Sequence, residues 1–109
     1  MARDEKMRLL VFTADWCGVC QAMSKSRAVE QFSAIASDVE VEHVDVPDPE
    51  AQHDVADDYA VRSMPTLVFE SSDGRELARI SGGTTFAGLQ KAYQKALGAL
   101  EQHPKRGKK

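Results

Sequence analysis

The sequence Thr13-Ala14-Asp15-Trp16-Cys17-Gly18-Val19-Cys20 holds both cysteines of the 109-residue chain, separated by two residues. An apolar run, Leu9–Phe12, precedes it, and a stretch with helix-like apolar spacing follows it. A cysteine at a helix N-terminus meets backbone N–H groups and the positive end of the helix dipole, and both favour thiolate over thiol. Because thiolates attack disulfides, the motif predicts dithiol–disulfide exchange, in which the second cysteine resolves the mixed disulfide.

Length and composition indicate one small globular domain. The chain has 109 residues, of which 42% are hydrophobic, and this suits a single folded core. No apolar run approaches the ~20 residues of a membrane span, and the polar start Met1–Lys6 has no signal-peptide apolar region behind it. We therefore predict a cytoplasmic protein without membrane association. In that compartment a close cysteine pair is more often catalytic or metal-binding than structural.

Charge is unevenly distributed along the chain. The net charge is −3, yet Asp38–Asp58 contains nine acidic residues and no Lys or Arg, whereas Lys105–Lys109 carries four positive charges. We predict that the acidic stretch forms solvated strand ends and a helix face. The folded domain is predicted at residues 7–101, followed by a basic, disordered tail at 102–109. No patterned basic face indicates a nucleic-acid partner.

Periodicity and turn signals predict the order β-α-β-α-β-β-α. A crossover helix joins the first two strands, so these should be parallel, and Ser71–Gly74 should close a hairpin. The sequence therefore predicts an α/β fold with a mixed sheet of about four strands and helices on both faces. The predicted strands are Arg8–Thr13, Val39–Val46, Thr66–Phe69 and Glu76–Ser81, and the predicted helices are Cys17–Ser37, Asp48–Tyr59 and a last one, capped by Thr84 or Thr85, that ends near Leu100.

This order, with Trp16–Cys20 after the first strand and Met64-Pro65-Thr66 before the third, resembles the thioredoxin family. The resemblance spans Arg8–Leu100 and implies the thioredoxin fold. A C-x-x-C pair alone also occurs in zinc sites, so the tryptophan, the strand–motif–helix context and the Met-Pro-Thr carry the match. The resemblance implies that Cys17 is the exposed nucleophile and Cys20 the buried resolving thiol.

The resemblance also implies a target-binding surface. Pro65 would be cis and lie against the active-site disulfide, and the backbone of Met64 would pair with an extended target strand. Trp16 and Gly82 would line an apolar groove, with Gly18 and Val19 also facing the target. Three plainer readings remain: Pro65 is a trans proline that starts a strand, Gly82-Gly83 is only a turn, and Trp16 is a core residue.

Two residues depart from the family pattern. Val19 stands where thioredoxins typically carry proline, and valine supplies an N–H. If that N–H meets the Cys17 sulfur, it stabilises the thiolate and makes the protein less reducing. Val11 stands where thioredoxins usually place a buried aspartate that moves the proton of the resolving thiol. His43 is aligned with the usual lysine partner of that aspartate, so it is either a proton-transfer group or an exposed strand histidine.

A third departure is length. Classical thioredoxins have another strand and helix before the active-site strand, and here only about seven residues precede it. Glutaredoxins share this minimal core and carry a Gly-Gly before the last helix, which Gly82-Gly83 echoes. The following Thr84-Thr85-Phe86 lacks the acidic residue of that family. The active-site tryptophan and the hairpin favour the thioredoxin side.

The sequence therefore predicts a thiol–disulfide oxidoreductase that reduces or exchanges protein disulfides through Cys17 and Cys20. We expect a monomer without a prosthetic group, recycled by thioredoxin reductase or by glutathione. The alternatives are a glutaredoxin-like, glutathione-coupled reductase and a non-catalytic thioredoxin-fold binding module. A metal site is disfavoured, because two cysteines supply half of a tetrahedral zinc shell and neither His43 nor His53 has motif-like spacing to them.

Overall fold

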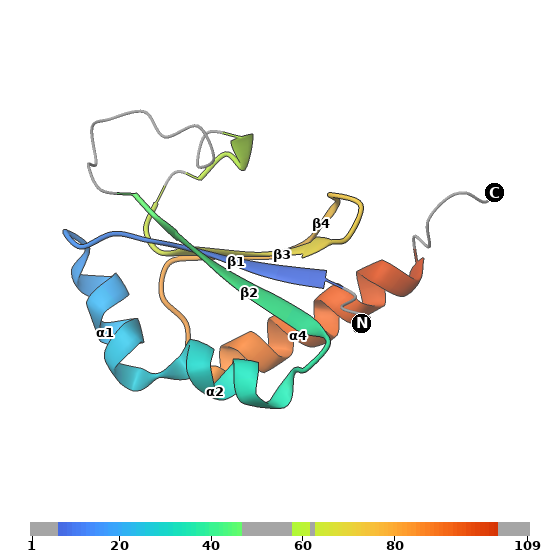
Figure 1. Cartoon of the computed structure of the whole chain (residues 1–109), viewed down its shortest axis with the longest axis horizontal. Helices are drawn as coiled ribbons and strands as arrows, with labels where there is room; N and C mark the ends of the chain where they lie inside the picture. The colour runs from blue at the N-terminus through green and yellow to red at the C-terminus, as the bar shows by residue number, and fades with distance from the viewer. Residues whose placement is uncertain (1–6, 47–57, 62, 103–109) are drawn as a thin grey trace.

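The computed structural model describes residues 7–46, 58–61 and 63–102. Its four strands form one mixed sheet in the order β2-β1-β3-β4. Strands β1 and β2 are parallel, whereas β3 is antiparallel to both β1 and β4. The elements are β1 (Met7–Thr13), α1 (Gly18–Ser26), α2 (Ala28–Ile35), β2 (Val39–Asp45), β3 (Thr66–Ser71), β4 (Glu76–Ser81) and α4 (Phe86–Gln102). The predicted mixed four-stranded α/β sheet is confirmed (Figure 1).

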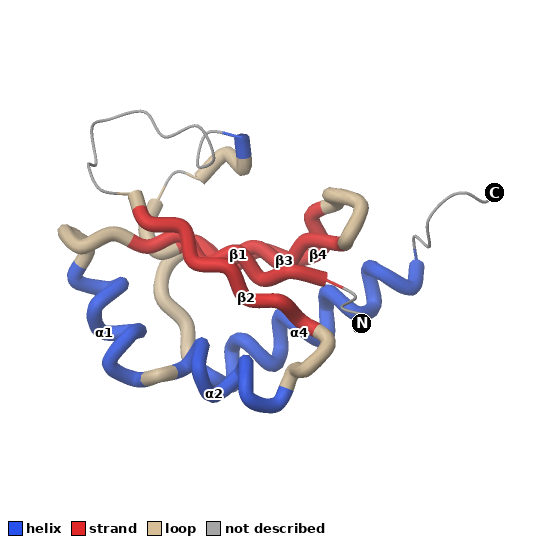
Figure 2. The backbone as a smooth tube through the Cα atoms, viewed as in Figure 1, coloured by secondary structure: helices blue, strands red, loops and turns tan. Residues whose placement is uncertain are grey.

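The described helices α1, α2 and α4 all cover the same face of the sheet (Figure 2). The predicted helix Asp48–Tyr59 lies outside the described residues except for its last two. On the opposite face Tyr59, Val61 and Met64 pack against a small apolar cluster that includes Phe12 and Val68. The opposite face of the sheet is therefore covered, at least in part, by the chain that leads into β3.

The main core lies between the sheet and the three helices. Its centre is an aromatic triangle of Phe32 from α2, Phe69 from β3 and Tyr93 from α4, with ring centroids 5.4–6.2 Å apart. The Tyr93 hydroxyl, at the polar end of this triangle, donates to the carboxylate of Asp38 at 2.8 Å. Truncation of a buried phenylalanine to alanine typically costs about 3–5 kcal/mol, so this triangle is a major contributor to stability.

The single helix predicted for Cys17–Ser37 is wrong, because Arg27 breaks it into α1 and α2. Arg27 adopts a left-handed conformation, with φ 60° and ψ 29°. The hydroxyl of Ser26 accepts the N–H of Ala28 at 3.3 Å and donates to the carbonyl of Met23 at 2.7 Å. This redirection lets α2 bury Val29 and Phe32 over the sheet. No glycine or proline marks the break in the sequence.

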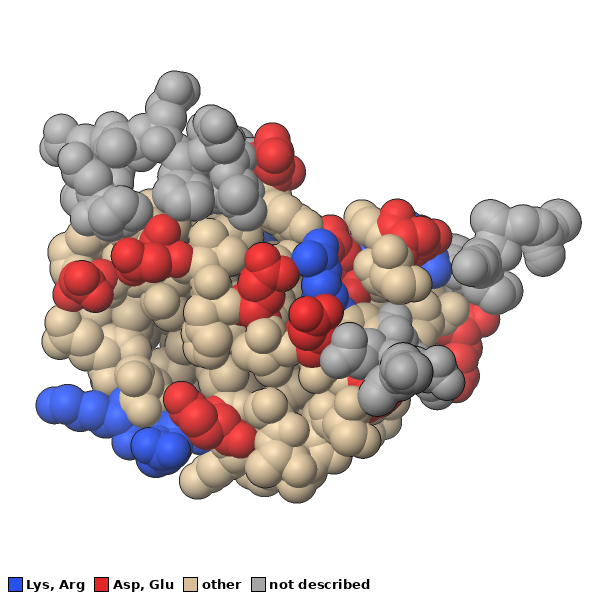
Figure 3. Space-filling model, viewed as in Figure 1, with Lys and Arg blue, Asp and Glu red and all other residues tan. Residues whose placement is uncertain are grey.

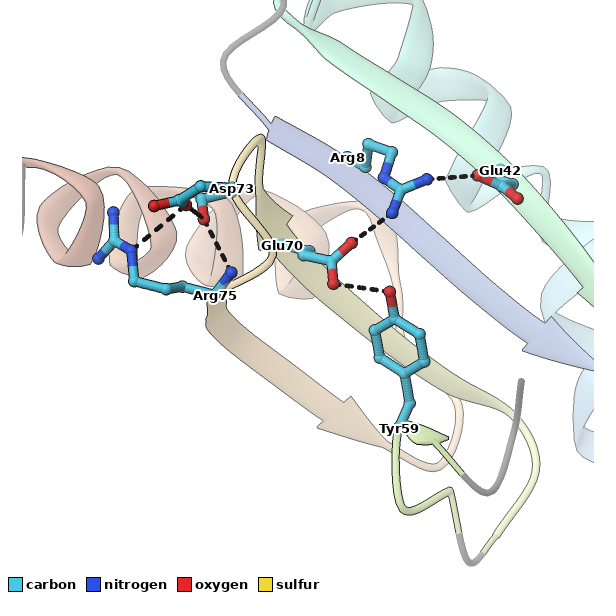
Figure 4. A network of polar contacts seen from close by, with 7 residues as sticks. Arg8, Glu42, Tyr59, Glu70, Asp73 and Arg75 are labelled. Atoms are coloured by element: carbon cyan, nitrogen blue, oxygen red, sulfur yellow. Dashed lines mark hydrogen bonds and ion pairs between the residues drawn. The ribbon is translucent and has the colours of Figure 1, made fainter. Parts of the chain in front are cut away.

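A polar network crosses the sheet face opposite the helices (Figure 4). Arg8 on β1 pairs with Glu70 on β3 at 2.6 Å and with Glu42 on β2 at 3.0 Å. The Tyr59 hydroxyl donates to the second oxygen of Glu70 at 2.6 Å. Burial, followed by this hydrogen bond, raises the pKa of Tyr59 to about 12. The network therefore ties the segment 58–61 to the middle of the sheet.

The loop after β4 leads directly into α4. The hydroxyl of Thr85 accepts the N–H of Gly88 at 3.1 Å, which confirms a predicted threonine cap. Helix α4 continues to Gln102, one residue into the range predicted for the basic tail. The rest of that predicted tail lies outside the described part of the chain. Gly82 has a φ of +93°, a conformation that glycine adopts readily, at the turn between β4 and this loop.

Candidate active site

The cysteine motif lies where β1 ends and α1 begins. The N–H of Cys17 donates to the carbonyl of Ala14 at 3.2 Å, which closes a tight turn through the exposed residues Asp15 and Trp16. Cys17 is the N-cap of α1 and has extended backbone angles. The strand-to-helix turn therefore holds the first sulfur at the N-terminus of a helix, as the sequence predicts.

The Cys17 sulfur has two polar neighbours. It accepts the backbone N–H of Cys20 at 3.1 Å, and its thiol lies 3.5 Å from the carbonyl oxygen of Met64 as a donor. A hydrogen bond to an ionised acceptor is about twice as strong as one between neutral groups, so the N–H of Cys20 favours the thiolate. The resemblance implies an exposed Cys17, but the residue is buried, with an exposed fraction of 8%. Ala14 and Met64 pack around it.

The donor to this sulfur is not the one that the sequence suggested. The hypothesis for Val19 required its N–H to meet the Cys17 sulfur, and the structure assigns that hydrogen bond to Cys20 instead. An N-cap side chain bonds the N–H two or three positions into the helix, and here it is the third position. A proline at position 19 would leave this bond intact. The hypothesis that Val19 makes the protein less reducing therefore loses the hydrogen bond on which it rests.

Cys20 lies deeper than Cys17 and is 4% exposed. Burial raises the pKa of the Cys20 thiol to about 11, and a hydrogen bond with Cys17 adds to the shift. The two cysteines are free thiols in the structure. Because a thiol is a poor nucleophile, Cys20 must lose its proton before it attacks a mixed disulfide.

The Met64–Pro65 peptide bond is cis, as the resemblance implies. Pro65 is buried, and its carbonyl accepts the N–H of Gly82 at 2.8 Å. Thr66 begins β3, and its hydroxyl donates to the carbonyl of Ser63 at 2.7 Å. These bonds join the start of β3 to the end of β4, and the contact between the Cys17 thiol and the Met64 carbonyl places both beside the motif turn.

Trp16 and Val19 flank Cys17 as exposed apolar side chains, 45% and 52% exposed respectively. The indole N–H of Trp16 donates to the carbonyl of Val46 at 3.1 Å, so the tryptophan is a surface residue held against the end of β2 and not a core residue. Gly18 lies between them and is exposed. The structure thus places Trp16, Gly18 and Val19 on the surface around Cys17.

Val19 also contacts the loop before α4. A Cβ on Gly83 would lie 2.7 Å from Cγ1 of Val19, so the valine occupies the space that any larger residue at 83 would need. A mainly apolar groove of about 320 Å³ lies beside this contact, between α1 and residues 83–85. Sequence reasoning missed Gly83, because a second glycine after Gly82 reads as part of a turn.

A second cavity lies behind the motif. It has a volume of about 390 Å³, is partly open to solvent, and lies among β1, α1, α2 and β2. Cys20 and Val11 line it together with His43 and Glu30. Val11 and His43 are register partners on the parallel strands β1 and β2. His43 is thus an exposed strand residue that also borders the cavity of the resolving thiol. Sequence reasoning missed Glu30, because the break at Arg27 shifts its position on the helix.

Figure 3 shows acidic side chains scattered over most of the face drawn. Basic side chains gather near the α1–α2 junction, where Lys25 and Arg27 are exposed, and a second basic group lies among the acidic ones in the middle of that face. Much of the acidic stretch 38–58 lies outside the described residues. Among those described, no group of three or more His, Cys, Asp or Glu is arranged to hold a metal ion. None of the helices described has the length and apolar character to cross a bilayer.

Fold and site together define a dithiol protein with a mixed sheet, a helix-capping cysteine and a cis-proline beside it. The chain belongs to the thioredoxin family: the family model "Thioredoxin" matches residues 1–95. It is 33% identical over 87 residues to thioredoxin-2 of Saccharomyces cerevisiae, covering 80% of this chain and 78% of that protein. It is 37% identical over 83 residues to thioredoxin-1 of Drosophila yakuba, covering 74% and 71%. The protein is therefore a thiol–disulfide oxidoreductase.

Other similarities agree with this placement. The chain is 33% identical over 91 residues to protein disulfide-isomerase of Drosophila melanogaster, covering 75% of this chain but only 18% of that protein. Among solved structures, the thioredoxin Deadhead of Drosophila melanogaster is 31% identical with a TM-score of 0.66, covering 84% of this chain and 82% of that one. Fasciola hepatica thioredoxin is 28% identical with a TM-score of 0.67, covering 85% and 83%.

Proposed function

We propose that this protein reduces or exchanges disulfides of protein targets through a two-thiol cycle in which Cys17 attacks and Cys20 resolves. The observation that supports these roles best is the hydrogen bond from the N–H of Cys20 to the Cys17 sulfur, 3.1 Å long, at the N-cap of α1. This bond stabilises negative charge on Cys17. Cys20 is the more deeply buried of the two, and burial raises the pKa of its thiol to about 11.

The cycle balances as follows. The Cys17 thiolate attacks one sulfur of the target disulfide, forms a Cys17–target mixed disulfide and releases the other target sulfur as a thiolate. Cys20 then loses its proton and attacks the Cys17 sulfur. The Cys17–Cys20 disulfide forms, the bond to the target breaks, and the second target thiolate leaves. The target gains two electrons and the protein loses two. No prosthetic group is needed, because the two sulfurs carry the electrons.

The target approaches from the surface around Cys17. The backbone of Met64 pairs with an extended target segment, since it precedes the first residue of β3 and lies against the Cys17 sulfur. Trp16 and Val19 supply apolar contact on either side, and Gly18 and Gly82 leave room for the target backbone. A target that is locally extended around its disulfide fits this surface best.

The donor that recycles the oxidised protein is a thioredoxin reductase, and the protein works as a cytoplasmic monomer. The similarity to thioredoxins of yeast and fly, which covers at least 71% of their length, supports this donor over glutathione. The exposed tryptophan before Cys17 and the missing acidic residue after Gly82-Gly83 argue in the same direction.

Insulin reduction tests the function and separates the two thiols. Wild-type protein should reduce insulin with thioredoxin reductase and NADPH, and much more slowly with glutathione and glutathione reductase. Cys17→Ser should abolish turnover. Cys20→Ser should stop after one attack and accumulate a target adduct on Cys17 that mass spectrometry detects. Activity with neither donor would support the binding-module alternative, and faster turnover with glutathione would support the glutaredoxin-like one.

A further inference from the structure

The thiol of Cys20 needs a proton acceptor, which the surface around Cys17 does not supply. Cys20 is 4% exposed, and burial raises the pKa of its thiol to about 11. At neutral pH it therefore carries a proton that must leave before Cys20 can attack. On the Cys17 side, the hydrogen-bond partners of the sulfur among the described residues are the backbone carbonyl of Met64 and the backbone N–H of Cys20. The acceptor for the Cys20 proton must therefore lie behind the motif.

The cavity behind Cys20 reaches titratable groups on three other segments. These are Asp15 in the motif turn, Glu30 on α2 and His43 on β2, which line it with Cys20. The neighbouring β2 residues Glu42 and Asp45 are exposed, and Glu42 pairs with Arg8 on the opposite sheet face. The cavity has a volume of about 390 Å³ and a partly apolar lining that includes the polar side chains of Asp15, Glu30 and His43, so it has room for several waters, each of which occupies about 30 Å³ in the liquid.

We propose that this cavity is the proton exit of the resolving thiol, with His43 as the acceptor through cavity water and Glu30 as the group that stabilises the protonated imidazole. This role rests on the two-thiol cycle of the proposed function. The proton of Cys20 passes to a water, which gives a proton to the neutral imidazole of His43. The Cys20 thiolate then attacks Cys17, and the imidazolium later releases its proton to solvent through the open side of the cavity.

His43 suits this task better than the other two groups that line the cavity. A proton acceptor works best when it titrates near the working pH, and histidine changes charge between pH 5 and 8, whereas carboxylates are weaker bases. Val11, the register partner of His43, has no ionisable group. Glu30 lines the same cavity from α2 and brings a carboxylate to the space into which the proton would pass.

The test uses an aromatic disulfide whose nitrothiobenzoate product absorbs visible light. The full-length reduced protein is first converted at about pH 4 to the Cys17–nitrothiobenzoate mixed disulfide, in which Cys20 stays protonated. A stopped-flow jump to each pH between 5 and 9 then starts resolution, and the release of the second nitrothiobenzoate reports the attack by Cys20. Formation of the adduct on Cys17 tests the proposed function by itself, so the two failures are distinguishable.

The wild-type resolution rate should rise with pH through an inflection between pH 5 and 8. His43→Ala should remove that inflection and slow resolution at pH 7, on the order of 100-fold. Added imidazole should restore part of the lost rate, which a purely structural role would not permit. Glu30→Gln should slow resolution at pH 7 less than His43→Ala does, since it removes the carboxylate and leaves the proton acceptor in place. Glu40→Gln, on the same strand but the other sheet face, should change neither rate nor profile.

Two results would overturn the proposal. One is an unchanged rate and pH profile in His43→Ala with adduct formation intact. The other is loss of the inflection in Glu30→Gln but not in His43→Ala, which would make the glutamate the acceptor. If His43→Ala is poorly folded by circular dichroism, His43→Gln keeps the size and polarity of the side chain and supplies the same readout.

Discussion

The two sulfurs of this site are three residues apart and yet lie in opposite surroundings. Cys17 caps a helix, accepts an N–H and meets the surface that carries Trp16 and Val19. Cys20 lies inside the first turn of the same helix and faces a cavity bordered by α2 and β2. One turn of helix thus separates a sulfur that accepts a backbone N–H from a deeper thiol whose pKa is raised by burial.

This difference shows how one motif can order two chemical steps. If both thiols ionised equally well, either could attack the target disulfide first. A buried second thiol that stays protonated waits until the mixed disulfide has formed. The contrast between the front and the back of the motif is therefore part of the mechanism, and each prediction below alters one side of it.

The largest expected effect concerns the reactivity of Cys20. In Cys17→Ser, alkylation of Cys20 by iodoacetamide should keep accelerating up to about pH 11, because burial, the main cause of the raised pKa, persists. At pH 8 a shift from 9 to about 11 reduces the thiolate fraction about 100-fold relative to an ordinary cysteine. Mass spectrometry of the alkylated peptide measures the rate. A midpoint of the alkylation rate at or below pH 9 would contradict the raised pKa of Cys20.

The raised pKa of Cys20 should also make the free energy of unfolding of the reduced protein depend on pH. A thiol whose pKa is raised in the folded state stabilises that state fully below its unfolded pKa and loses this effect as pH rises. Between pH 9 and 11 the reduced form should therefore lose up to about 1.4 kcal/mol per pH unit relative to the oxidised form. Urea unfolding of both forms measures this.

The oxidised protein is the matched control for this experiment. Tyr59 and Tyr93, whose pKa values are raised to about 12 mainly by burial, titrate in both forms. Their contributions cancel in the difference between the two forms. Parallel stability curves from pH 8 to 11 would show that neither thiol has a raised pKa in the folded state.

A smaller effect should be confined to the Cys17 side. Gly83→Ala places a Cβ 2.7 Å from Cγ1 of Val19, and overpacking of this kind costs about 1–3 kcal/mol. The variant should unfold at lower urea and reduce insulin with a higher KM. The resolution rate of the preformed mixed disulfide should stay near wild type. The pair Gly83→Ala with Val19→Ala should recover most of the stability, and failure to do so would show that the clash is relieved elsewhere.

The smallest effect concerns residue 19 and the reduction potential. Since the N–H of Cys20 and not that of Val19 meets the Cys17 sulfur, Val19→Pro removes no hydrogen bond from it. We expect Val19→Pro and Val19→Ala to have potentials within about 10 mV of each other, a third of the 30 mV that corresponds to 1.4 kcal/mol. Equilibration with a glutathione redox buffer measures both. A clearly more reducing proline variant would restore the original hypothesis.

The sequence predicted the parts of this fold that depend on local signals. The apolar run of β1, the turn Ser71–Gly74 and the glycine at 82 each point to one structure, and all three are found. The break at Arg27 was not predictable in this way, because a serine hydroxyl and tertiary packing impose it on a residue that tolerates helix.

The candidate site shows the same division. Trp16, Cys17 and Met64 could be named from their order along the chain. Other features of the site depend on elements that meet only after folding. These are the packing over Cys17, the cavity behind Cys20 and the position of Glu30 in its lining. The sequence suggested the N–H of Val19 as donor to the Cys17 sulfur, whereas the donor is the N–H of the next residue, Cys20. An N-cap side chain can accept the N–H of either the second or the third helical residue, and the sequence does not distinguish these two.

The contact between Val19 and Gly83 has a consequence for how this protein can evolve. A methyl group at 83 costs stability unless the side chain at 19 has first become smaller, so the order of two substitutions matters even when their combination is acceptable. Lineages that begin with valine at 19 should keep glycine at 83, and those with a smaller residue at 19 should be free to vary there. The two positions form an epistatic pair, linking the second residue of the C-x-x-C spacer to a loop 64 residues further along the chain.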